Sequence, residues 1–376
     1  MNIAFLGCGY VANMYRLSLG GHPELNLVGV YDVDTQRSAA LADTTNCSVY
    51  SNFDALIADT SVDLVLNLTN PSAHYETSKA LLEAGKHVFT EKPITLSLEQ
   101  SQRLTDLANE RGLFLTSAPC TVHSPAAKAL FEVVRSSAVG TIRAVYAEMD
   151  DGMVHRAPFK KWVNELGVAW PYADEFEVGC TLEHAGYVLS WLCALFGPVT
   201  RMTSFYDTLV EDKVPGETIN NAADFSVACL AFESGVVARL TNGIYAPKDH
   251  ALRVFGDDGI TVVADPRSDT SKVWTQRYHK IRRRRFLSPL KRQVKLKNLG
   301  DLPKYRGSQV RDFCRSIAHM KRCIETGQSP VISNAYWLHI AEITLACQGL
   351  AKPSPDAMSY VPQTHFDKSQ FVGQLT

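Results

Sequence analysis

The strongest constraint on the fold is an alternation of short hydrophobic runs and helix-like segments over the first third of the chain. Runs rich in Val, Ile and Leu occur at residues 2–6, 26–31, 62–68, 86–90 and 113–116. Apolar residues at helical spacing lie between them, at residues 11–19, 35–42, 72–84 and 98–111. This order is typical of βαβ units, so we predict a doubly wound parallel sheet over residues 1–120.

The pattern changes after Pro119, where longer segments alternate apolar and polar residues. Such alternation predicts antiparallel strands, and it occurs at residues 142–149, 199–205, 223–232 and 236–242. Helical patterns interrupt them at 124–136, 181–196 and 308–326. We therefore predict an α+β domain with a large, mostly antiparallel open sheet over residues 121–350. Its last helix, about 334–350, is expected to pack back on the first domain, and residues 351–376 to form an irregular tail.

Composition and charge exclude several classes of protein. Lys and Arg total 38 against 39 Asp and Glu, so the chain has no charge excess that favours nucleic acid or a membrane surface. No apolar run approaches the ~20 residues of a membrane span, and the chain opens directly with a predicted strand instead of a signal peptide. The 9 cysteines lack the spacing of a zinc site. We expect a cytoplasmic protein without a bound metal.

A glycine motif follows the first predicted strand and opens a helix. Residues 7–12, Gly-Cys-Gly-Tyr-Val-Ala, match the G-x-G-x-x-A fingerprint of a Rossmann dinucleotide site. Gly7 permits the tight turn, Gly9 lets the backbone approach the pyrophosphate, and Ala12 lets the helix pack close to the strand. We expect Tyr10 and Val11, at the start of the helix, to contact the cofactor as well.

The second strand ends in a carboxylate that bears on the choice of cofactor. Asp32 lies where an acidic residue accepts hydrogen bonds from the adenosine ribose, which favours NAD over NADP. A 2′-phosphate beside this carboxylate would be repelled. Arg37 is near enough in the sequence to keep NADP use open as the less favoured alternative.

Residues 91–93, Glu-Lys-Pro, follow the strand at 86–90. Three further stretches accompany this tripeptide: Asn-Pro-Ser-Ala-His at 70–74, Gly-Lys-His-Val at 85–88 and residues 254–259. In these four features the sequence resembles the Gfo/Idh/MocA oxidoreductase family, and the resemblance extends over nearly its whole length. The resemblance implies that Lys92 contacts substrate near the nicotinamide and that the Pro93 peptide bond is cis. Further cofactor contacts are expected from Thr69, Asn70, Pro71, His74 and Glu91.

Members of that family carry an Asp-x-x-x-His pair on a helix of the second domain, and this chain departs from it. Glu183 stands at the Asp position and Tyr187 at the His position, while His184 follows the carboxylate directly. Glu183 and Tyr187 share one helix face because they are four residues apart. The resemblance therefore makes Lys92, Glu183, Tyr187 and His184 the candidate catalytic residues.

Two residues compete for proton transfer. A tyrosine ordinarily has a pKa near ~10, too high for a base at neutral pH, but an adjacent ammonium such as that of Lys92 would favour the phenolate. Histidine titrates in a more suitable range, although the one-residue offset turns the His184 side chain by about 100° from the face of Glu183. We favour Tyr187 over His184, with neither as a further alternative.

Three other features are candidates for ligand contacts. His123 and the aromatic residue Trp162 are expected to face the substrate, although Trp162 could equally be a core residue. Residues 280–297 contain 9 basic and no acidic residues. This stretch is either a solvated loop, a clamp for an anionic substrate or an oligomer contact.

The leading hypothesis is an NAD(H)-dependent dehydrogenase or reductase acting on a secondary alcohol or ketone of a sugar, a cyclitol or a nucleotide-linked sugar. NAD-assisted elimination or glycoside cleavage, with the cofactor recycled in place, is one alternative. A non-catalytic NAD-sensing regulator is another, suggested by the change of His to Tyr187. We expect a homodimer or homotetramer that pairs through the open sheet face, and no nucleic-acid or membrane partner.

Overall fold

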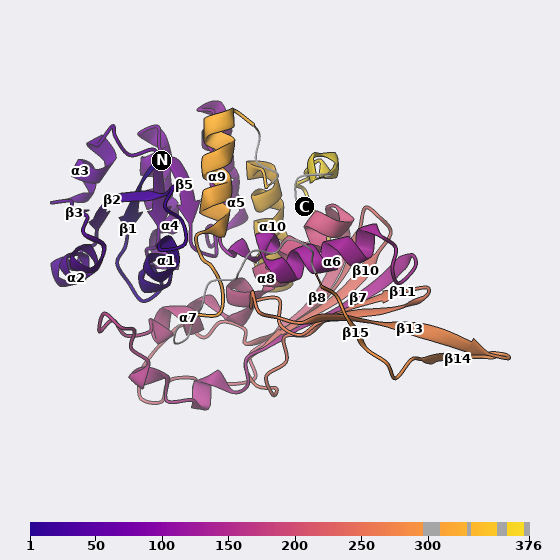
Figure 1. Ribbon diagram of the computed structural model, residues 1–376. Helices are drawn as coiled ribbons and strands as arrows, with labels where there is room; N and C mark the ends of the chain where they lie inside the picture. Colours follow the sequence, from indigo (N-terminus) through magenta and orange to yellow (C-terminus); the bar gives the residue numbers. More distant parts are fainter. Residues whose placement is uncertain (296–308, 329–331, 352–358, 372–376) are drawn as a thin grey trace.

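The computed structural model describes residues 1–295, 309–328, 332–351 and 359–371, which form two β-sheets with helices packed against them (Figure 1). The first sheet has six parallel strands in the order β3-β2-β1-β4-β5-β6. Its strands are β1 (Asn2–Leu6), β2 (Asn26–Tyr31), β3 (Ser48–Val49), β4 (Leu64–Asn67), β5 (His87–Thr90) and β6 (Leu115–Ser117). The predicted doubly wound sheet is confirmed, and only β3 was not expected.

Helices connect these strands: α1 (Ala12–Leu19), α2 (Thr35–Thr45), α3 (Phe53–Ala58), α4 (His74–Glu83) and α5 (Leu98–Glu110). The order of the strands reverses between β1 and β4, which lie side by side. Ligands bind in such sheets outside the carboxyl ends of the strands at this switch point. The glycine motif after β1 and the loop after β4 therefore meet where a cofactor site is expected.

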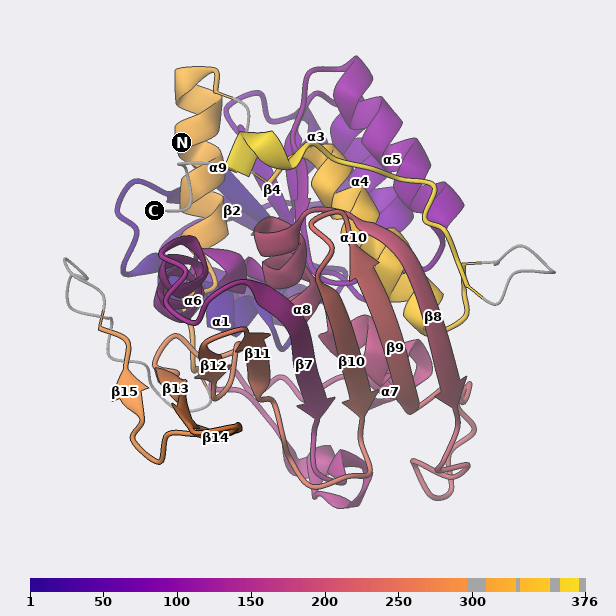
Figure 2. The ribbon, with the colours of Figure 1, turned by 90° about the vertical axis from the view of Figure 1, so that its right-hand side faces the viewer.

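The second sheet has nine strands, most of them antiparallel, and confirms the predicted open sheet. Its main order is β14-β13-β12-β11-β7-β10-β9-β8, with β15 paired to β13 and with β7 and β10 parallel. The strands are β7 (Ile142–Asp150), β8 (Val199–Asp207), β9 (Phe225–Phe232), β10 (Val237–Gly243), β11 (Leu252–Gly256), β12 (Gly259–Val263), β13 (Val273–Ile281), β14 (Arg284–Leu287) and β15 (Arg292–Gln293). One face of β7 to β10 has no helix over it (Figure 2).

Five further helices complete the described chain: α6 (Pro125–Arg135), α7 (Tyr172–Val178), α8 (Cys180–Phe196), α9 (Arg315–Thr326) and α10 (Asn334–Cys347). Short 3-10 turns occur at Pro71–Ala73, Cys120–His123, Val154–Arg156, Phe159–Lys161 and Lys368–Phe371. The helix expected over 308–326 begins only at Arg315, and residue 308 lies outside the described residues. Residues 309–314 have no regular secondary structure and contain bends.

The last long helix, α10, lies against the first sheet. The Asn334 side chain at its start donates to the carbonyl of Leu113 at 3.0 Å and accepts from the amide of Leu115 at 2.9 Å. One hydrophobic cluster runs from Ala4 in β1 through Trp191 in α8 to Ile343 in α10. The described part of the tail is anchored as well, since Tyr360 pairs with Met202 of β8.

The basic stretch is not the loop that its charge suggested. Over the described residues 280–295 it forms the end of β13, a tight turn at Arg282 and Arg283, and the strands β14 and β15. This hairpin projects from the edge of the second sheet (Figure 1), away from the cofactor edge of the first sheet. This position does not favour a clamp over a substrate bound at the first sheet of the same chain. Among the described residues, no helix has the length and apolar character needed to cross a membrane.

Candidate active site

A cavity of about 280 Å³ opens at the carboxyl edge of the first sheet, between that sheet and the helices of the second unit. The part of the chain that forms the first sheet, here called the first unit, contributes Gly9, Tyr10, Val11, Thr69, Asn70, Pro71, Glu91 and Lys92 to its walls. The second contributes Trp170, Asp174, Glu175, Glu183 and Tyr187, and the segment before α9 contributes Arg311. Residues that we predicted for cofactor and for catalysis thus line one space.

The glycine turn has the geometry that a dinucleotide needs. Gly7 has a φ of +96°, and a Cβ there would lie 2.7 Å from the carbonyl group of Leu68, so no other residue fits. A Cβ at Gly9 would meet nothing within 4 Å, because this residue borders the cavity. Ala12 is fully buried against the sheet. The backbone at Gly9 is therefore open to a phosphate while the rest of the turn is packed.

Asp32 holds the turn in place. Its carboxylate accepts from the amide of Cys8 at 2.6 Å and from the amide of Asp34 at 2.8 Å. Carboxylate oxygens have further lone pairs, so hydrogen bonds from a ribose remain possible. Arg37 lies 3.2 Å from the Asp34 carboxylate and is engaged at the start of α2.

The loop after β5 carries the Glu-Lys-Pro stretch, and its Lys92–Pro93 bond is cis, as the family resemblance implied. Glu91 is buried and accepts from the Tyr15 hydroxyl at 2.5 Å. His74 was expected to contact the cofactor, but it is fully buried, and its ring nitrogens lie 2.7 Å from the Pro93 carbonyl and 2.9 Å from the Thr69 carbonyl. It does not line the cavity; it links the loop after β4 to the loop after β5.

Lys92 extends toward the second unit, where its ammonium donates to the carboxylate of Glu183 on α8. Glu175 on α7 lies 3.7 Å from the same nitrogen. Burial acts to lower the pKa of Lys92, but the negative charges of Glu175 and Glu91 outweigh it, so that the pKa is raised. Lys92 is therefore a firmly charged group that connects the loop after β5 to α8.

Tyr187 lies one turn beyond Glu183 on α8 and lines the same cavity. Its hydroxyl oxygen accepts a hydrogen bond of 2.6 Å from the guanidinium of Arg311. The sequence predicted that Lys92 would provide the positive charge beside this hydroxyl. In the structure Arg311 is the group in hydrogen-bond contact with it, whereas Lys92 is paired with Glu183 and interacts with Tyr187 only electrostatically.

Arg311 could not be found from the sequence, because it belongs to no motif and reaches the site only through the fold. It lies in the extended segment just before α9, in a region predicted to be helical. Its guanidinium packs 4.5 Å from the centre of the Phe313 ring and also donates to the carbonyl of Arg267 at 3.1 Å. These contacts fix the direction of the side chain toward Tyr187.

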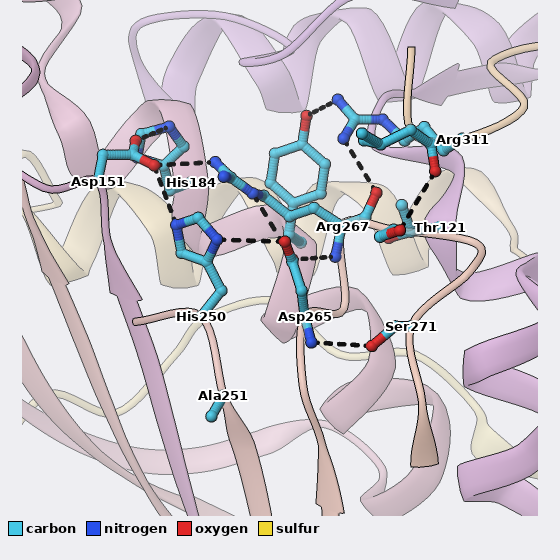
Figure 3. Close-up of polar contacts among 12 residues, drawn as sticks. Thr121, Asp151, His184, His250, Ala251, Asp265, Arg267, Ser271 and Arg311 are labelled. Carbon is cyan, nitrogen blue, oxygen red and sulfur yellow. Dashed lines mark hydrogen bonds and ion pairs between the residues drawn. The ribbon is translucent and has the colours of Figure 1, made fainter. Parts of the chain in front are cut away.

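His184 does not face the same groups as Glu183, as their one-residue offset indicated, and it belongs to a partly buried polar network (Figure 3). Its Nε2 lies 2.8 Å from Asp151 at the end of β7. The same carboxylate contacts His250 at 3.0 Å and Arg267 at 3.1 Å. Burial alone would raise the pKa of Asp151, but His184 and the other partners hold it far below its usual range. His184 does not line the cavity that contains Lys92 and Tyr187.

Two expected substrate residues lie elsewhere. His123 packs beneath α9, with its ring 4.6 Å from that of His319, and does not border the cavity. Trp162 belongs to an aromatic cluster, 5.1 Å from Trp170 between ring centres. Trp170 lines the cavity instead. The sequence alone could not distinguish which of the two tryptophan rings borders the cavity.

The network adjoins a second carboxylate whose ionisation is unfavourable. Burial, together with the like charges of Glu148 and Asp249, raises the pKa of Asp150 to about 6. An unfolded aspartate titrates near ~3.9. Because the folded pKa is the higher one, the folded state loses stability as the pH rises from about 4 through 6.

We therefore expect Asp150→Asn to raise the melting temperature at pH 8 and to change it little at pH 4. Circular dichroism during heating at both pH values measures this, with the exposed Asp43→Asn as the control. An equal effect of Asp150→Asn at both pH values would contradict the prediction.

The chain was also compared with known proteins. Residues 1–118 match the family model described as oxidoreductase family, NAD-binding Rossmann fold, and residues 127–262 match the Gfo/Idh/MocA C-terminal domain. The two matches together cover most of the chain. The fold and the site thus define an NAD(P)-binding oxidoreductase. The chain belongs to the Gfo/Idh/MocA family.

Individual proteins to which the chain is similar share a third or less of its residues in the matched regions. A dTDP-3,4-didehydro-2,6-dideoxy-alpha-D-glucose 3-reductase of Streptomyces violaceoruber is 32% identical over 148 residues, which span 39% of this chain and 43% of that protein. The trans-1,2-dihydrobenzene-1,2-diol dehydrogenase of Mus musculus is 24% identical over 90% of this chain and 93% of its own length. Levoglucosan dehydrogenase in complex with NADH has the same fold, with a TM-score of 0.76 and 17% identity over 93% of this chain and 96% of that one.

Proposed function

We propose that the chain is an NAD(H)-dependent dehydrogenase or reductase that acts on a secondary alcohol or ketone of a sugar, a cyclitol or a nucleotide-linked sugar. One observation carries the proposal: the Lys92–Glu183 pair and the Tyr187–Arg311 pair line the same cavity as the glycine turn. The sugar reductase and the levoglucosan dehydrogenase to which the chain is similar support the substrate class.

The open backbone at Gly9, the packed turn at Gly7 and the carboxylate of Asp32 fit a dinucleotide, whose nicotinamide accepts or gives a hydride when bound. In the reductive direction the Tyr187 hydroxyl gives its proton to the substrate oxygen. Arg311 stabilises the negative charge that is left on the phenolate. In the oxidative direction the same phenolate takes the proton of the substrate hydroxyl.

Lys92 and Glu183 have a different role from Tyr187 and Arg311 in this mechanism. The ammonium of Lys92 has three donors, of which Glu183 uses one, so others can bind the reacting oxygen of the substrate. This charge lowers the energy of an alkoxide as it develops. The retained lysine and carboxylate favour an enzyme over a regulator that only senses NAD.

Incubation of the purified protein with NAD⁺ and a panel of sugars, cyclitols and nucleotide sugars tests the function. NADH absorbance reports net oxidation, and the reverse reaction with ketosugars and NADH reports reduction. Accumulation of NADH with at least one member is expected. NAD(H) binding without hydride transfer to any member in either direction would contradict the proposal.

We also propose that NAD(H) is preferred over NADP(H), because of the Asp32 carboxylate. Asp32→Asn should reduce the preference by about tenfold, since it removes the repulsion of a 2′-phosphate while keeping one hydrogen-bond acceptor for the turn. Fluorescence titration with NADH and NADPH measures both affinities. Tighter binding of NADPH by the unmodified protein would contradict the assignment.

We further propose a homodimer or homotetramer that pairs through the open face of β7 to β10. Tyr146, Phe205 and Val237 on these strands are 42%, 57% and 49% exposed. Apolar side chains on an uncovered sheet favour association of two copies. Light scattering at micromolar concentration is expected to give at least twice the mass of the chain, and Phe205→Lys to reduce it. A monomer under these conditions would contradict the proposal.

A further inference from the structure

We propose that a second, smaller cavity beside the active site is a substrate subsite, and that it selects uncharged or amino-bearing sugars against carboxylated or phosphorylated ones. This inference rests on the proposed function. The cavity has a volume of about 60 Å³, enough for a few hydroxyl groups. Trp170, Glu175 and Glu183 line both cavities, so the two adjoin. A ligand held by Lys92 in the first can therefore extend into the second.

His184 gives the subsite an unused hydrogen-bonding atom. The ring lines the small cavity, and its Nε2 is engaged by Asp151 at 2.8 Å. The contact with the Asp151 carboxylate places a hydrogen on Nε2, and whenever the ring carries that one proton, Nδ1 has a free lone pair and is an acceptor. This Nδ1 is buried and has no hydrogen-bond partner within the described part of the chain. A buried acceptor without a partner is costly, so a donor from a ligand or a water is expected there.

Fixed charge in the subsite disfavours an anion. Among the described residues its walls carry four carboxylates, from Asp151, Glu175, Glu183 and Asp224, and one lysine, Lys213. Three of these carboxylates have a close cation, namely Arg267, Lys92 and Lys213, so the negative charge that a ligand meets comes mainly from Glu175. Lys213 cannot bind an anion, because its ammonium is 3.3 Å from Asp224 and also donates to the Ala222 carbonyl and to Asn221. All three of its donors are used.

The remaining groups suit a ligand that donates hydrogen bonds. Glu175 is held only loosely by Lys92, at 3.7 Å, and lines both cavities. Trp170 and Phe176 add apolar walls, which accommodate the carbon face of a sugar ring. Hydroxyl groups satisfy the His184 and Glu175 acceptors, and an ammonium in place of one hydroxyl would gain from the carboxylates. A carboxylate or phosphate at the same position would be repelled.

Calorimetry with NADH-saturated protein tests the inference. Each matched set contains a neutral hexose, its 2-amino derivative, its uronate and its 6-phosphate, in the gluco, galacto and manno series. In at least one series we expect the neutral and amino sugars to bind, and the two anionic sugars to bind at least tenfold more weakly. His184→Phe should weaken neutral and amino sugars by about tenfold, the usual value of one hydrogen bond to a buried partner, and leave NADH affinity unchanged. The exposed His279→Phe is the matched control.

Glu175→Gln provides a second measurement that does not depend on His184. It should reduce the preference for the amino over the neutral sugar, whereas the exposed Glu211→Gln should not. The inference is overturned if anionic sugars bind as tightly as neutral ones, if no neutral or amino sugar binds, or if both variants leave every affinity unchanged. NADH binding and hydride transfer are measured in the same samples, so that failure of this inference can be distinguished from failure of the proposed function. If the protein turns over a phosphorylated sugar, for example, the subsite inference is wrong but the proposed function still holds.

Discussion

Replacing Tyr187 by Phe is expected to reduce turnover by a factor of about 10²–10⁴, the usual contribution of general acid-base catalysis, while folding and NADH affinity are preserved. The change removes only the hydroxyl that accepts from Arg311 at 2.6 Å. The ring, which packs 4.8 Å from the Arg311 guanidinium, remains in place. Steady-state kinetics with a substrate from the panel above measures the effect.

Two comparisons make this prediction specific. Tyr245→Phe removes a hydroxyl from a ring that is 45% exposed and outside the cavity, and it should leave turnover unchanged. Arg311→Met should reduce turnover as well, because the phenolate loses its counter-charge. The assignment is wrong if Tyr187→Phe keeps full turnover while His184→Phe abolishes it. If Tyr187 transfers the proton and His184 binds the substrate, His184→Phe changes KM and Tyr187→Phe changes kcat.

Replacing Lys92 by Met is expected to abolish measurable turnover and to lower the free energy of unfolding by about 3–5 kcal/mol, the cost of leaving a buried charge unpaired. Glu183 has only 4% of its side chain exposed and would lose its cation. Chemical denaturation gives the change in stability, and the rate assay gives the change in activity.

The double variant Lys92→Met/Glu183→Gln separates the two effects. Removing both charges should recover most of the lost stability, because no unpaired charge remains, but it should not recover activity. If Lys92→Met is fully active, Lys92 has no catalytic role. If the double variant is no more stable than the single one, the ion pair is not the source of the instability.

The parts of the molecule that could be predicted from sequence are those in which local pattern determines the outcome. The runs that became β1, β2, β4, β5 and β6 have the composition and spacing of parallel strands, and the glycine turn follows β1 directly. Lys92, Glu183 and Tyr187 were chosen by the family resemblance, and the structure places all three on the walls of one cavity. The one-residue offset from Glu183 on the helix indicated that His184 faces other groups.

The residues that the sequence did not reveal are brought into the site by long-range packing. Arg311 is 124 positions from Tyr187, and no periodicity marks an extended segment before a helix. Glu175 and Trp170 lie between Trp162 and Glu183, which were considered, but which side chains of this segment line the cavity depends on how the segment packs. The β13–β14 hairpin was missed because Arg282 and Arg283 replace the usual Asn-Gly turn, although Arg282 has the positive φ of 54° that favours glycine or asparagine.

The position of α10 has a consequence for how the chain can be divided. This helix comes late in the sequence, yet Asn334 completes hydrogen bonds at the edge of β6, and Ile343 belongs to the same apolar cluster as Ala4. A fragment that ends after the first sheet would lose this cover and expose apolar surface to water. We therefore expect the first sheet to be less stable when it is excised without α10 than when it is part of the whole chain.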